Sequence, residues 1–567
     1  MRYLALACDF DETLAQQGQL KSATISALEK LSASGRKLIL VTGREFDDLI
    51  SVCPKINLFA QVVAENGALL YCPATREEKL LADGPPEKFI KALRERSIPF
   101  SHGRRIVSAH RSYDAALLEV ISDLGLEYQL IFNKAAVMLL PSGVNKASGL
   151  SAALQELKLS PHNVVAIGDA ENDFAFLNLC ECSVAVSNAL PSLCERADFV
   201  TDGANGDGVA ELIEELLDSD LSERDERLAR HHILLGTRDG SEVKLPPYSK
   251  NLLLAGAPGS GKSTLATGFL ERLLQARYQF CVVDPEGDYE SFESAIALGN
   301  NQKAPELEEI LRVLEDSDNN VVVNMVSLGL DDRPAFLLSL LSRMQEMRAR
   351  IGRPHWIVID EAHHVLPSSW NPAAAVLPRA MEGTILISIH PEAVIPIALE
   401  TVQTVIAVGD KPNQAVKEFC NVVGATPPST GPQVLAQGEA LFWSRTAGQP
   451  FVFTIAPNRT QRRRHQRKYA EGELPGNRSF YFKGPDHRLN LRARNLIAFI
   501  QMAEGVDDET WLYHLHQRDY SRWFRQAIKD EALAEEAFKI ESSPEISAAQ
   551  SRRLIKELVA RRYTLPE

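Results

Sequence analysis

The strongest constraint in this sequence is an alternation of short apolar runs with amphipathic helical stretches, which occurs twice along the chain. The alternation predicts parallel sheets covered by helices. In the first third of the chain the apolar runs lie at 4–9, 37–41, 61–64, 164–168 and 183–186, with helical stretches such as 22–34 between them. The second series has runs at 252–255, 279–284, 320–326, 356–360, 384–389 and 405–408.

The length predicts several domains, because 567 residues suffice for about three or four of ordinary size. We expect an α/β domain at 1–217, with a small α+β cap inserted at about 80–142. A charged linker at 218–231 and a second α/β domain at 232–457 follow. A basic hinge at 458–478 and a mostly helical domain at 479–567 complete the expected order.

Composition limits the function classes. The formal net charge of -14 does not favour nucleic-acid binding by overall attraction, although a local basic patch can still bind. The eight cysteines include no CxxC pair, and Cys180 and Cys182 are interpreted as buried small hydrophobes at a strand start. No run of about 18 apolar residues occurs, and the N-terminus does not match a signal peptide. We therefore expect a cytoplasmic protein with reduced thiols and no membrane span.

Two acidic residues follow the first apolar run, in the segment Asp9-Phe10-Asp11-Glu12-Thr13. Ligands of open parallel sheets bind at the carboxyl ends of the strands, so both carboxylates are expected in one crevice. One of the two carboxylates can attack phosphorus and form an aspartyl-phosphate. The other can protonate the leaving oxygen and then activate water.

Three later segments supply further groups for phosphate chemistry. Thr42-Gly43-Arg44 follows the second run, where a hydroxyl and a backbone N–H can hold phosphate oxygens. Lys146 opens an expected helix and can neutralise phosphate and nucleophile. Gly168-Asp169-Ala170-Glu171-Asn172-Asp173 follows another run. Its Asp169 would complete an oxygen cage for Mg²⁺ with Asp9 and the Asp11 carbonyl.

These four segments, in this order, resemble the motifs of the haloacid dehalogenase (HAD) superfamily. Cof-type phosphatases, with a cap between the second and third motifs, are the nearest match. Glu65-Asn66-Gly67-Ala68 and Asn188-Ala189 are also similar to that group. The resemblance covers about 1–217 and implies a Rossmann-like, Mg²⁺-dependent phosphatase of a small phosphorylated substrate. The implied roles are nucleophile for Asp9, acid/base for Asp11, phosphate binding for Thr42, Gly43, Lys146 and Asn172, and metal binding for Asp9, Asp11 and Asp169, with Asp173 supporting the metal shell and Lys146.

The short cap constrains the substrate weakly. The family resemblance suggests sugar phosphates and phosphoglycolate as substrates. Arg104, Arg105 and His110 lie in the cap and either contact an anionic substrate or remain solvated charges.

A second phosphate-binding motif lies in the second α/β region. Residues 256–263 fit the pattern GxxxxGK[ST], between an apolar run and the helical stretch 264–275. The glycines let backbone N–H groups cradle phosphates, while Lys262 meets the β- and γ-phosphates and Ser263 holds Mg²⁺. The expected nucleotide-binding residues are Gly256, Ala257, Pro258, Gly259, Ser260, Gly261, Lys262, Ser263, Thr264 and Asp360.

The apolar run 356–360 ends in two acids. Asp360 fits the metal-linked Walker B position, and Glu361 fits the base that activates water for attack on the γ-phosphate. The two motifs together predict that this region binds and hydrolyses ATP.

The segment Asp284-Pro285-Glu286-Gly287-Asp288-Tyr289 and residues 236–240 are similar to segments of HerA/FtsK-type P-loop ATPases. The resemblance covers about 232–457 and implies a RecA-like domain. Two departures count against DNA translocation. Ser388-Ile389-His390 stands where these motors often place a glutamine, and the segment before the P-loop is too short for the HerA β-barrel.

The same resemblance implies a homo-oligomeric ring, with a hexamer as the expected state. Arg379 is then a candidate for a finger supplied to the neighbouring subunit, although an ordinary surface arginine is the default interpretation. Six basic residues within 459–468 favour a solvated hinge over a nucleic-acid contact. Trp511 and Trp523 are expected to pack in the core of the helical C-terminal region.

Three hypotheses follow for the whole chain. The preferred one is a phosphatase of a small metabolite whose activity or assembly is governed by ATP. The second is a nucleic-acid motor with an accessory phosphatase. The third is a regulatory protein whose partner binding is gated by ATP.

Overall fold

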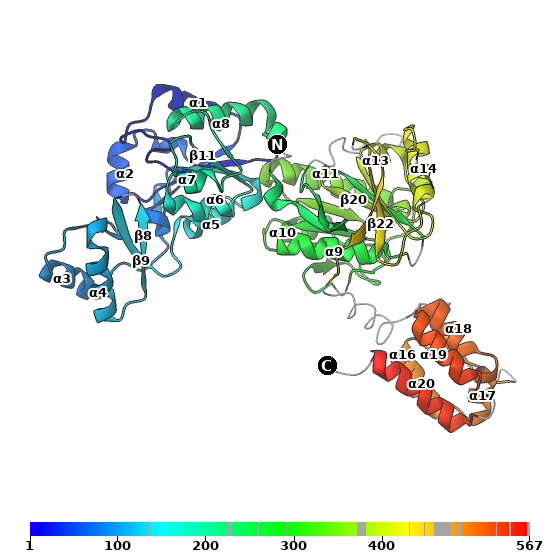
Figure 1. Ribbon diagram of the computed structural model, residues 1–567. Coiled ribbons are helices and arrows are strands. Elements are labelled where there is room, and N and C mark those ends of the chain that lie inside the picture. The colour runs from blue at the N-terminus through cyan, green and yellow to red at the C-terminus, as the bar shows by residue number, and fades with distance from the viewer. Residues whose placement is uncertain are drawn as a thin grey trace. The chain divides into compact units, whose positions relative to one another are not determined.

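The computed structural model describes residues 1–133, 135–224, 228–248, 250–257, 260–290, 292–370, 382–429, 431, 433–446, 448–458, 474, 478–485, 489–528, 530–543 and 546–563 (Figure 1). The chain forms two compact units. One comprises Met1–Gly256 with Arg272–Ile455, and the other comprises Ala257–Glu271 with Ala456–Glu567.

The first unit begins with an eight-stranded sheet in the order β12-β11-β10-β1-β2-β3-β4-β5. Neighbouring strands pair in parallel from β12 to β3, and the last two pairings are antiparallel. The strands are β1 (Ala5–Cys8), β2 (Lys37–Val41), β3 (Gln61–Ala64), β4 (Leu69–Cys72), β5 (Glu77–Leu80), β10 (Val164–Gly168), β11 (Cys182–Ala185) and β12 (Phe199–Val200).

The register of the central strands gathers the motif residues at one edge. Cys8 of β1 lies opposite Ile167 of β10 and Leu40 of β2. The residues that leave the carboxyl ends of these three strands therefore emerge side by side, as expected for a ligand-binding edge of a parallel sheet.

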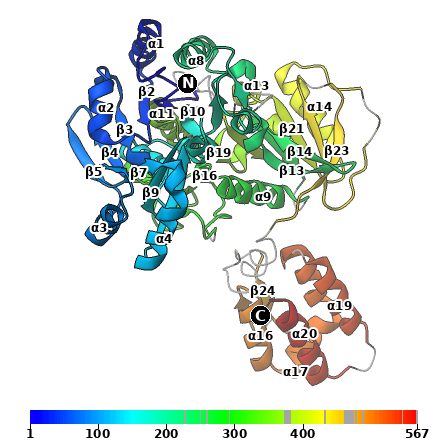
Figure 2. The same ribbon diagram turned by 60° about the vertical axis from the view of Figure 1, so that its left-hand side comes forward.

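Helices cover both faces of this sheet. Leu28, Leu49 and Leu212 belong to the apolar cluster on one face, and Leu150, Leu154 and Phe176 belong to the cluster on the other. The helices of the first face are α1 (Ser22–Ala33), α2 (Phe46–Val52) and α8 (Gly206–Ser219), with α1 beside α8 (Figures 1 and 2). Those of the second face are α5 (Lys146–Glu156), α6 (Phe174–Leu179) and α7 (Pro191–Cys194).

The expected α+β cap is present. Its antiparallel sheet has the order β6-β7-β9-β8, and Phe89, Leu93 and Leu117 pack its two helices onto the strands (Figure 2). The opposite side carries Met138, which packs with Ala68 of the main sheet region. The elements are α3 (Glu87–Glu95), β6 (Phe100–His102), β7 (Val107–His110), α4 (Asp114–Leu124), β8 (Tyr128–Asn133) and β9 (Ala136–Pro141).

The second sheet of this unit has eleven strands in the order β14-β13-β23-β22-β21-β15-β20-β19-β16-β18-β17. Its strands from β21 to β17 are parallel, and a mainly antiparallel extension begins at β22. The strands are β13 (Ile233–Arg238), β14 (Ser241–Leu245), β15 (Leu252–Gly256), β16 (Phe280–Asp284), β17 (Ile296–Leu298), β18 (Val321–Asn324), β19 (Trp356–Ile359), β20 (Thr384–Ser388), β21 (Thr404–Val408), β22 (Glu439–Ser444) and β23 (Phe451–Ile455).

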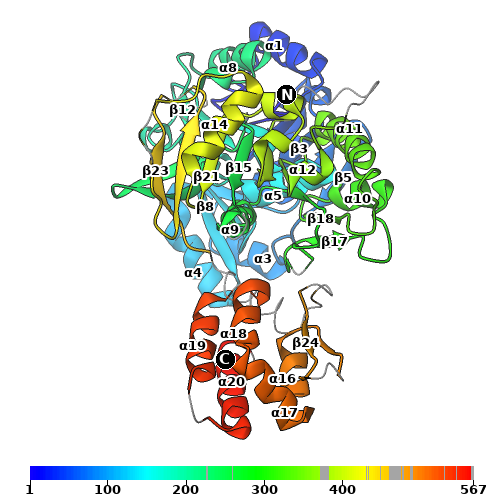
Figure 3. The same ribbon diagram turned by 90° about the vertical axis from the view of Figure 1, so that its right-hand side faces the viewer.

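A single apolar cluster joins this sheet to helices on one of its faces. It contains Ile310, Leu337 and Phe419 from three helices, together with inward-facing strand residues. The helices are α10 (Leu307–Leu314), α11 (Arg333–Ile351), α12 (Ala362–Val365), α13 (Pro396–Glu400) and α14 (Pro412–Val423), and Figure 3 shows α10 beside α11. Helix α9 (Lys262–Gln275) begins in the P-loop motif and so passes from one compact unit into the other.

Short helical turns connect many of these elements. The 3-10 turns are Ile56–Leu58, Glu65–Gly67, Arg111–Tyr113, Pro161–Asn163, Glu171–Asp173, Ser222–Arg224, Ala229–His231 and Pro391–Ala393. Among the described residues, no helix is both long enough and apolar enough to cross a membrane.

The second compact unit contains a helical bundle with an aromatic core (Figure 3). Trp511 is fully buried, its indole N–H donates to Ser551 Oγ at 3.0 Å, and Tyr520 donates to the Trp511 carbonyl at 3.0 Å. Trp523 is also buried, so the expected core role of both tryptophans is confirmed. The elements are β24 (Phe480–Phe482), β25 (Leu491–Ala493), α16 (Leu496–Gly505), α17 (Asp508–His516), α18 (Asp519–Trp523), a π-helical turn at Phe524–Ile528, α19 (Glu531–Glu541) and α20 (Ala548–Tyr563).

Gly352, at the end of α11, is in close contact with the turn that precedes β10 of the other sheet. This glycine ends α11 with a φ of 71°, and a Cβ added there would overlap the side-chain amide of Asn163, which precedes β10. Glycine is therefore favoured at this position for two reasons: the backbone is left-handed, and the Asn163 side chain leaves no room for a Cβ.

Replacing this glycine tests the contact. Gly352→Ala is expected to lower the free energy of unfolding by about 1–2 kcal/mol from the left-handed backbone and by about 1–3 kcal/mol more from the overlap with Asn163. Gly424→Ala is the matched control, because Gly424 ends α14 at a φ of 65° with nothing within 4 Å of an added Cβ. Thermal melts of the two variants should differ by several degrees. Equal midpoints would contradict the Asn163 contact.

Candidate active sites

A buried lysine joins two carboxylates at the carboxyl edge of the first sheet. Asn145 caps α5 by accepting hydrogen bonds from Ala147 N and Ser148 N, which fixes Lys146 at the first helical position. The Lys146 ammonium then lies 2.5 Å from Asp9 Oδ1 and 2.6 Å from Asp173 Oδ1, and its side chain is only 1% exposed.

The turn after β10 holds the remaining carboxylates. Asp173 Oδ2 accepts the backbone N–H groups of Asp169 and Ala170, both at 2.9 Å. Thr13 donates its hydroxyl to Asp169 Oδ1 at 3.1 Å, which links the first motif to the last. The turn is thereby fixed relative to the strand that precedes Asp9.

The carboxylates fit a divalent cation. Each of Asp9, Asp169 and Asp173 offers an oxygen, these oxygens lie within 4.8 Å of one another, and all three residues are buried. Carboxylate oxygens are the ligands that Mg²⁺ prefers, so the donor set matches the expected ion. Asp173 also accepts hydrogen bonds from Lys146 and from two backbone N–H groups, so its oxygens have a structural role as well.

Burial and neighbouring charges shift the pKa values of Asp9 and Lys146. Burial raises the pKa of Asp9, the neighbouring Asp173 carboxylate raises it further, and Lys146 opposes both effects. Burial alone would lower the pKa of Lys146, but the charges of Asp173 and Asp9 raise it, so the lysine stays protonated. A fixed positive charge therefore faces the carboxylate that is expected to attack phosphorus.

Asp11 is held by an arginine whose role the sequence analysis missed. Arg44 donates from Nε to Asp11 Oδ2 at 2.7 Å and from Nη2 to Asp11 Oδ1 at 2.6 Å, the paired geometry that guanidinium and carboxylate groups favour. The hydrogen bonds to Asp11 raise the pKa of Arg44. The signal was available, because Arg44 completes the second motif, but nothing in the sequence indicated its partner.

The expected phosphate ligands lie at the same edge. Thr42 Oγ1 accepts the N–H of Arg44 at 3.1 Å, and Asn172 donates to Asn66 Oδ1 at 3.2 Å. A Cβ added to Gly43 would lie 2.8 Å from Met138 Cε and 3.3 Å from Asn172 Nδ2. A cap side chain therefore lies directly over the glycine whose N–H is expected to hold phosphate.

Both cap arginines are held through their backbones, and Arg104 is also held through its side chain. Glu65 accepts the backbone N–H groups of Arg104 at 2.8 Å and Arg105 at 2.6 Å. The Arg104 guanidinium pairs with Asp47 at 2.9 Å and with Glu78. His110 is exposed and accepts the Ser112 N–H at its ring nitrogen. The ion pairs of Arg104 favour the alternative in which its charge is not reserved for substrate.

The described residues of the P-loop motif, Gly256, Ala257 and 260–263, lie next to or within the start of α9. Ser260 N donates to the Ala257 carbonyl at 3.2 Å, and Lys262 Nζ donates to the same carbonyl at 3.1 Å. Gly261 has a φ of 102° with nothing within 4 Å of an added Cβ, so the turn uses a backbone conformation that glycine supplies. Ser263 is exposed, and Thr264 is half-buried.

The expected Walker B acids follow β19. Asp360 is buried and accepts the N–H of Glu361 at 2.9 Å. Burial, followed by the charges of Glu361 and Asp284, raises the pKa of Asp360 to about 8. This excess of buried negative charge is the environment that a divalent cation stabilises. Strand β15, which precedes the P-loop, is separated from β19 by β20 alone, so their carboxyl ends share one edge of the sheet.

Two further residues surround Glu361. His363 Nδ1 lies 3.4 Å from Glu361 Oε2 and 3.3 Å from the hydroxyl of Ser388, at the end of β20. Ser388 therefore lies near the acid expected to act as a base, with His363 between the two side chains. The sequence analysis did not identify His363, because its separation from Ser388 along the chain hides their contact.

Asp284 has a structural role in the segment that resembles HerA/FtsK proteins. Its carboxylate accepts backbone N–H groups from Gly287 at 2.8 Å, Asp288 at 3.0 Å and Tyr289 at 2.7 Å. The acid therefore closes the turn that follows β16, which explains why an aspartate stands at the end of that strand.

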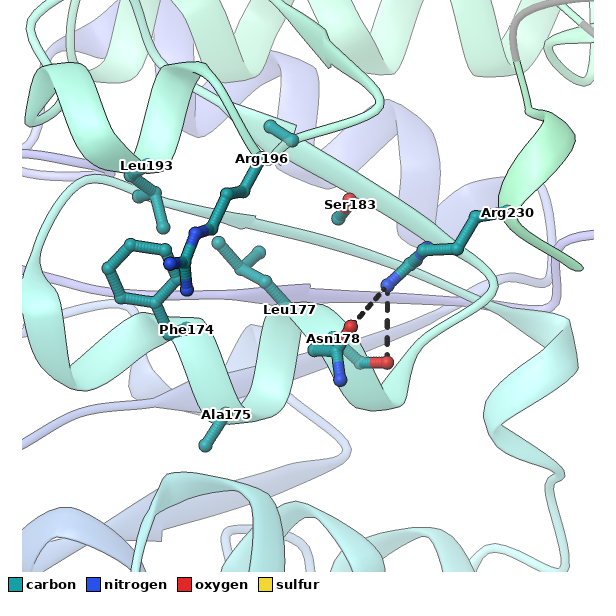
Figure 4. Close-up of a pocket in the computed structure, with 9 residues that line it drawn as sticks. Phe174, Ala175, Leu177, Asn178, Ser183, Leu193, Arg196 and Arg230 are labelled. Atoms are coloured by element: carbon teal, nitrogen blue, oxygen red, sulfur yellow. Dashed lines mark hydrogen bonds between the residues drawn. The ribbon is translucent and has the colours of Figure 1, made fainter.

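A separate pocket of about 400 Å³ lies between α6, α7 and β11 (Figure 4). Arg196 lies over the Phe174 ring at 5.1 Å, and Arg230 donates to the carbonyl and side-chain oxygens of Asn178. None of its lining residues belongs to the four phosphate motifs: Phe174, Ala175, Leu177, Asn178, Ser183, Leu193, Arg196, Ala197 and Arg230.

Several predicted residues lie outside the described part of the chain. These are Pro258, Gly259, Arg379 and the basic residues within 459–468. The ring finger and the basic hinge therefore stay predictions.

Family models match parts of both α/β regions of the chain. Residues 6–113 and 130–213 match the model of haloacid dehalogenase-like hydrolases, and residues 248–389 match that of an AAA domain. The solved structures that resemble the chain include a haloacid dehalogenase-like hydrolase from Bacteroides thetaiotaomicron. It is 21% identical, with a TM-score of 0.34, over 38% of this chain and 99% of that one.

Curated relatives match the first region. Phosphoglycolate phosphatase 2 of Saccharolobus solfataricus is 32% identical over 222 residues, which cover 38% of this chain and 92% of the relative. A phosphoglycolate phosphatase of Methanothermobacter thermautotrophicus is 33% identical over 218 residues, which cover 37% of this chain and 96% of the relative. Through its first domain the chain thus belongs to the haloacid dehalogenase-like hydrolases, as a phosphatase homologue that also carries an AAA domain.

Proposed function

We propose that the chain is a Mg²⁺-dependent phosphomonoester hydrolase of a small phosphorylated metabolite, and that its second domain binds and hydrolyses ATP and controls phosphatase activity or assembly. The observation that carries the phosphatase proposal is the buried contact of Lys146 with Asp9 and Asp173, at the edge where Asp169 also lies. A nucleophilic carboxylate, a phosphate-neutralising cation and a set of metal-binding oxygens meet there.

The reaction takes two displacements. An oxygen of Asp9 attacks phosphorus, the bond from phosphorus to the leaving oxygen breaks, and an aspartyl-phosphate forms. Asp11 gives a proton to the leaving oxygen and later takes one from the water that attacks the same phosphorus. That attack breaks the Asp9–phosphorus bond and releases inorganic phosphate. Before each proton transfer, the pair between Asp11 and Arg44 has to open.

Lys146 stabilises negative charge during both displacement steps. It lies beside Asp9 in the resting site and would neutralise phosphate oxygens as the phosphoryl group is transferred. The Asp9 and Asp169 carboxylates and the Asp11 carbonyl would hold the Mg²⁺, with Asp173 supporting them. The ion would supply positive charge to the transferring phosphoryl oxygens.

The cap favours a short substrate. Met138 of the cap lies so close to Gly43 that a Cβ added to this glycine would be 2.8 Å from Met138 Cε, which supports limited space beside this phosphate-binding residue. The curated relatives are named phosphoglycolate phosphatases. We therefore propose a phosphorylated two- or three-carbon acid, with phosphoglycolate as the first compound to assay.

For the second domain, Lys262 would bind the β- and γ-phosphates, Ser263 and Asp360 would hold the metal, and Glu361 would activate water. The HerA/FtsK resemblance adds the proposal of a homo-oligomeric ring. The contact of His363 with both Glu361 and Ser388 supports a site in which the strand after Walker B orients the base.

Replacing the nucleophile is expected to abolish phosphatase activity. Asp9→Asn keeps the side-chain shape but cannot form the aspartyl-phosphate, so turnover of an aryl phosphate should fall on the order of 10³-fold or more. The ATPase rate should be unchanged. Asp123→Asn, in an exposed ion pair of the cap, is the matched control and should retain full turnover. Substantial Mg²⁺-dependent turnover by Asp9→Asn would reject the assignment.

Metal removal tests the carboxylate site. Chelation should stop aryl phosphate turnover, and added Mg²⁺ should restore it. Asp169→Asn should raise the Mg²⁺ concentration for half-maximal rate by at least about tenfold, because one charged oxygen is lost. The titration is followed by aryl phosphate turnover. Full activity after complete chelation would contradict the proposed metal requirement.

Substitutions of Lys262 and Glu361 are expected to separate nucleotide binding from ATP hydrolysis. Glu361→Gln should bind ATP with wild-type affinity but lower hydrolysis on the order of 10²-fold, since the amide cannot accept the proton of the attacking water. Lys262→Ala should weaken binding itself. Binding is measured with a fluorescent nucleotide and hydrolysis by phosphate release, with exposed Glu400→Gln as the control. Hydrolysis by Glu361→Gln at the wild-type rate would remove Glu361 from the role.

A further inference from the structure

A buried carboxylate lies where the phosphatase domain meets the AAA domain. Glu181 directly precedes β11, and its side chain is fully buried. Its Oε1 accepts from Arg2 Nη2 at 2.8 Å, and its Oε2 contacts His162 Nδ1 at 2.7 Å and the Tyr278 hydroxyl at 2.8 Å. Burial alone would raise the pKa of Glu181, but the hydrogen bond and charge of His162, with Arg2, lower it to about 2.

His162 makes the second half of the contact. Its Nε2 lies 2.7 Å from the Ala276 carbonyl, while its Nδ1 faces Glu181. Both partners are acceptors, so the ring satisfies both only when both of its nitrogens carry a proton. A neutral ring keeps one of these hydrogen bonds and loses the other. The contact therefore has two discrete arrangements, one with both bonds and one with a single bond.

The surrounding groups fix the ring in place. His162 stacks on Tyr278 at 3.8 Å between centroids, and Tyr248 donates to the His162 carbonyl at 2.9 Å. From the AAA side, Arg353 donates to the Lys158 carbonyl at 2.9 Å, close to where β10 begins. The titratable and charged groups around His162 are Arg2, Glu181, His231, Tyr248, Tyr278, Arg353 and His355.

A metal ion is not needed to explain this cluster. His162, Glu181 and His231 offer ligand atoms within 4.8 Å of one another. However, both oxygens of Glu181 accept protein hydrogen bonds, and both ring nitrogens of His162 have acceptors. The His231 ring nitrogen faces the Cys180 carbonyl at 3.3 Å. The cluster is therefore a complete hydrogen-bonded junction.

The junction connects the two proposed sites along the chain. On the AAA side, Ala276 and Tyr278 follow the end of α9, the helix that begins at Lys262 of the P-loop. On the phosphatase side, His162 lies just before β10, and Asp169 follows the end of that strand. Strand β10 is hydrogen-bonded between β1 and β11, so its two ends are rigidly related.

We propose that His162 and Glu181 are positioning residues through which nucleotide binding at the P-loop changes the geometry of the phosphatase site. The inference rests on the proposed function and specifies its regulation. A change in α9 on nucleotide binding moves the Ala276 carbonyl and the Tyr278 hydroxyl relative to their partners. The junction then exchanges between its two arrangements, and β10 carries the displacement to Asp169.

The experiment measures kcat and KM for an aryl phosphate in the full-length protein, with and without a non-hydrolysable ATP analogue. In the wild type the analogue should change kcat/KM about fivefold or more, the usual size of coupling between two sites. Tyr278→Phe removes only the hydroxyl that Glu181 binds. It should reduce this response to less than about twofold, while kcat without nucleotide and affinity for the analogue stay at wild-type values.

Two further variants make the result specific. Tyr520→Phe removes a buried tyrosine hydroxyl that donates to a backbone carbonyl in the other compact unit, so it should keep the wild-type response. Glu181→Gln keeps the size of the side chain but removes its charge, and it should lose the response as Tyr278→Phe does. Circular dichroism and analogue binding establish that each variant is folded.

The outcomes separate this inference from the function on which it rests. If the wild type hydrolyses the aryl phosphate and binds the analogue, but its kcat/KM does not respond, the coupling is overturned and both site assignments stand. A full response in Tyr278→Phe and Glu181→Gln would equally overturn the role of the junction. Absence of phosphatase activity in the wild type would instead reject the proposed function itself.

Discussion

The phosphatase site depends on one buried lysine. Lys146 is in contact with Asp9 and Asp173, and an Asp169 oxygen lies within 4.8 Å of oxygens of both acids. Burying an unpaired charge costs free energy. The ion pairs with Lys146 therefore stabilise these carboxylates at the edge of the sheet. Three carboxylates and one ammonium leave two negative charges. A divalent cation balances that excess, which relates the electrostatics of the protein to the proposed Mg²⁺.

The backbone enforces this arrangement from three directions. The register of β1 with β10 brings Asp9 beside the turn that contains Asp169, and the side-chain cap at Asn145 fixes the start of α5. The Asp173 carboxylate holds the turn itself through backbone N–H groups. Because Asp9, Lys146 and the turn that holds Asp169 and Asp173 follow from different elements, the site needs the fold of the whole domain and not a single loop.

Sequence alone predicted the central parallel strands of both sheets and the order of the motifs, because apolar runs and glycine-rich turns are local signals. The outer strands, such as β4, β5, β22 and β23, were not predicted. The structure has strands at Lys37–Val41, Gln61–Ala64 and Val164–Gly168, as the runs predict. Other runs were too long at their ends. The run 4–9 contains β1 (Ala5–Cys8), because Asp9 leaves the strand to join the site. The run 320–326 likewise shortens to β18 (Val321–Asn324).

Contacts between distant segments were beyond the reach of sequence reasoning. Arg44 was visible in its motif, but its paired contact with Asp11 depends on how β1 and β2 lie together. Cys180 and Cys182 were correctly expected to be buried, yet Glu181 between them gave no sign of its role. Its partners Arg2, His162 and Tyr278 come from three separate parts of the chain, and no local pattern joins them.

The central claim, that Asp9 is a phosphorylated nucleophile, is tested most directly by trapping the intermediate. The protein is mixed with an aryl phosphate and Mg²⁺, quenched in acid within its first turnovers, digested and analysed by mass spectrometry. The account predicts one added phosphoryl group on the peptide that contains Asp9, labile to hydroxylamine and missing from Asp9→Asn. A phosphoryl group on another residue, or none in an active protein during steady turnover, would contradict it.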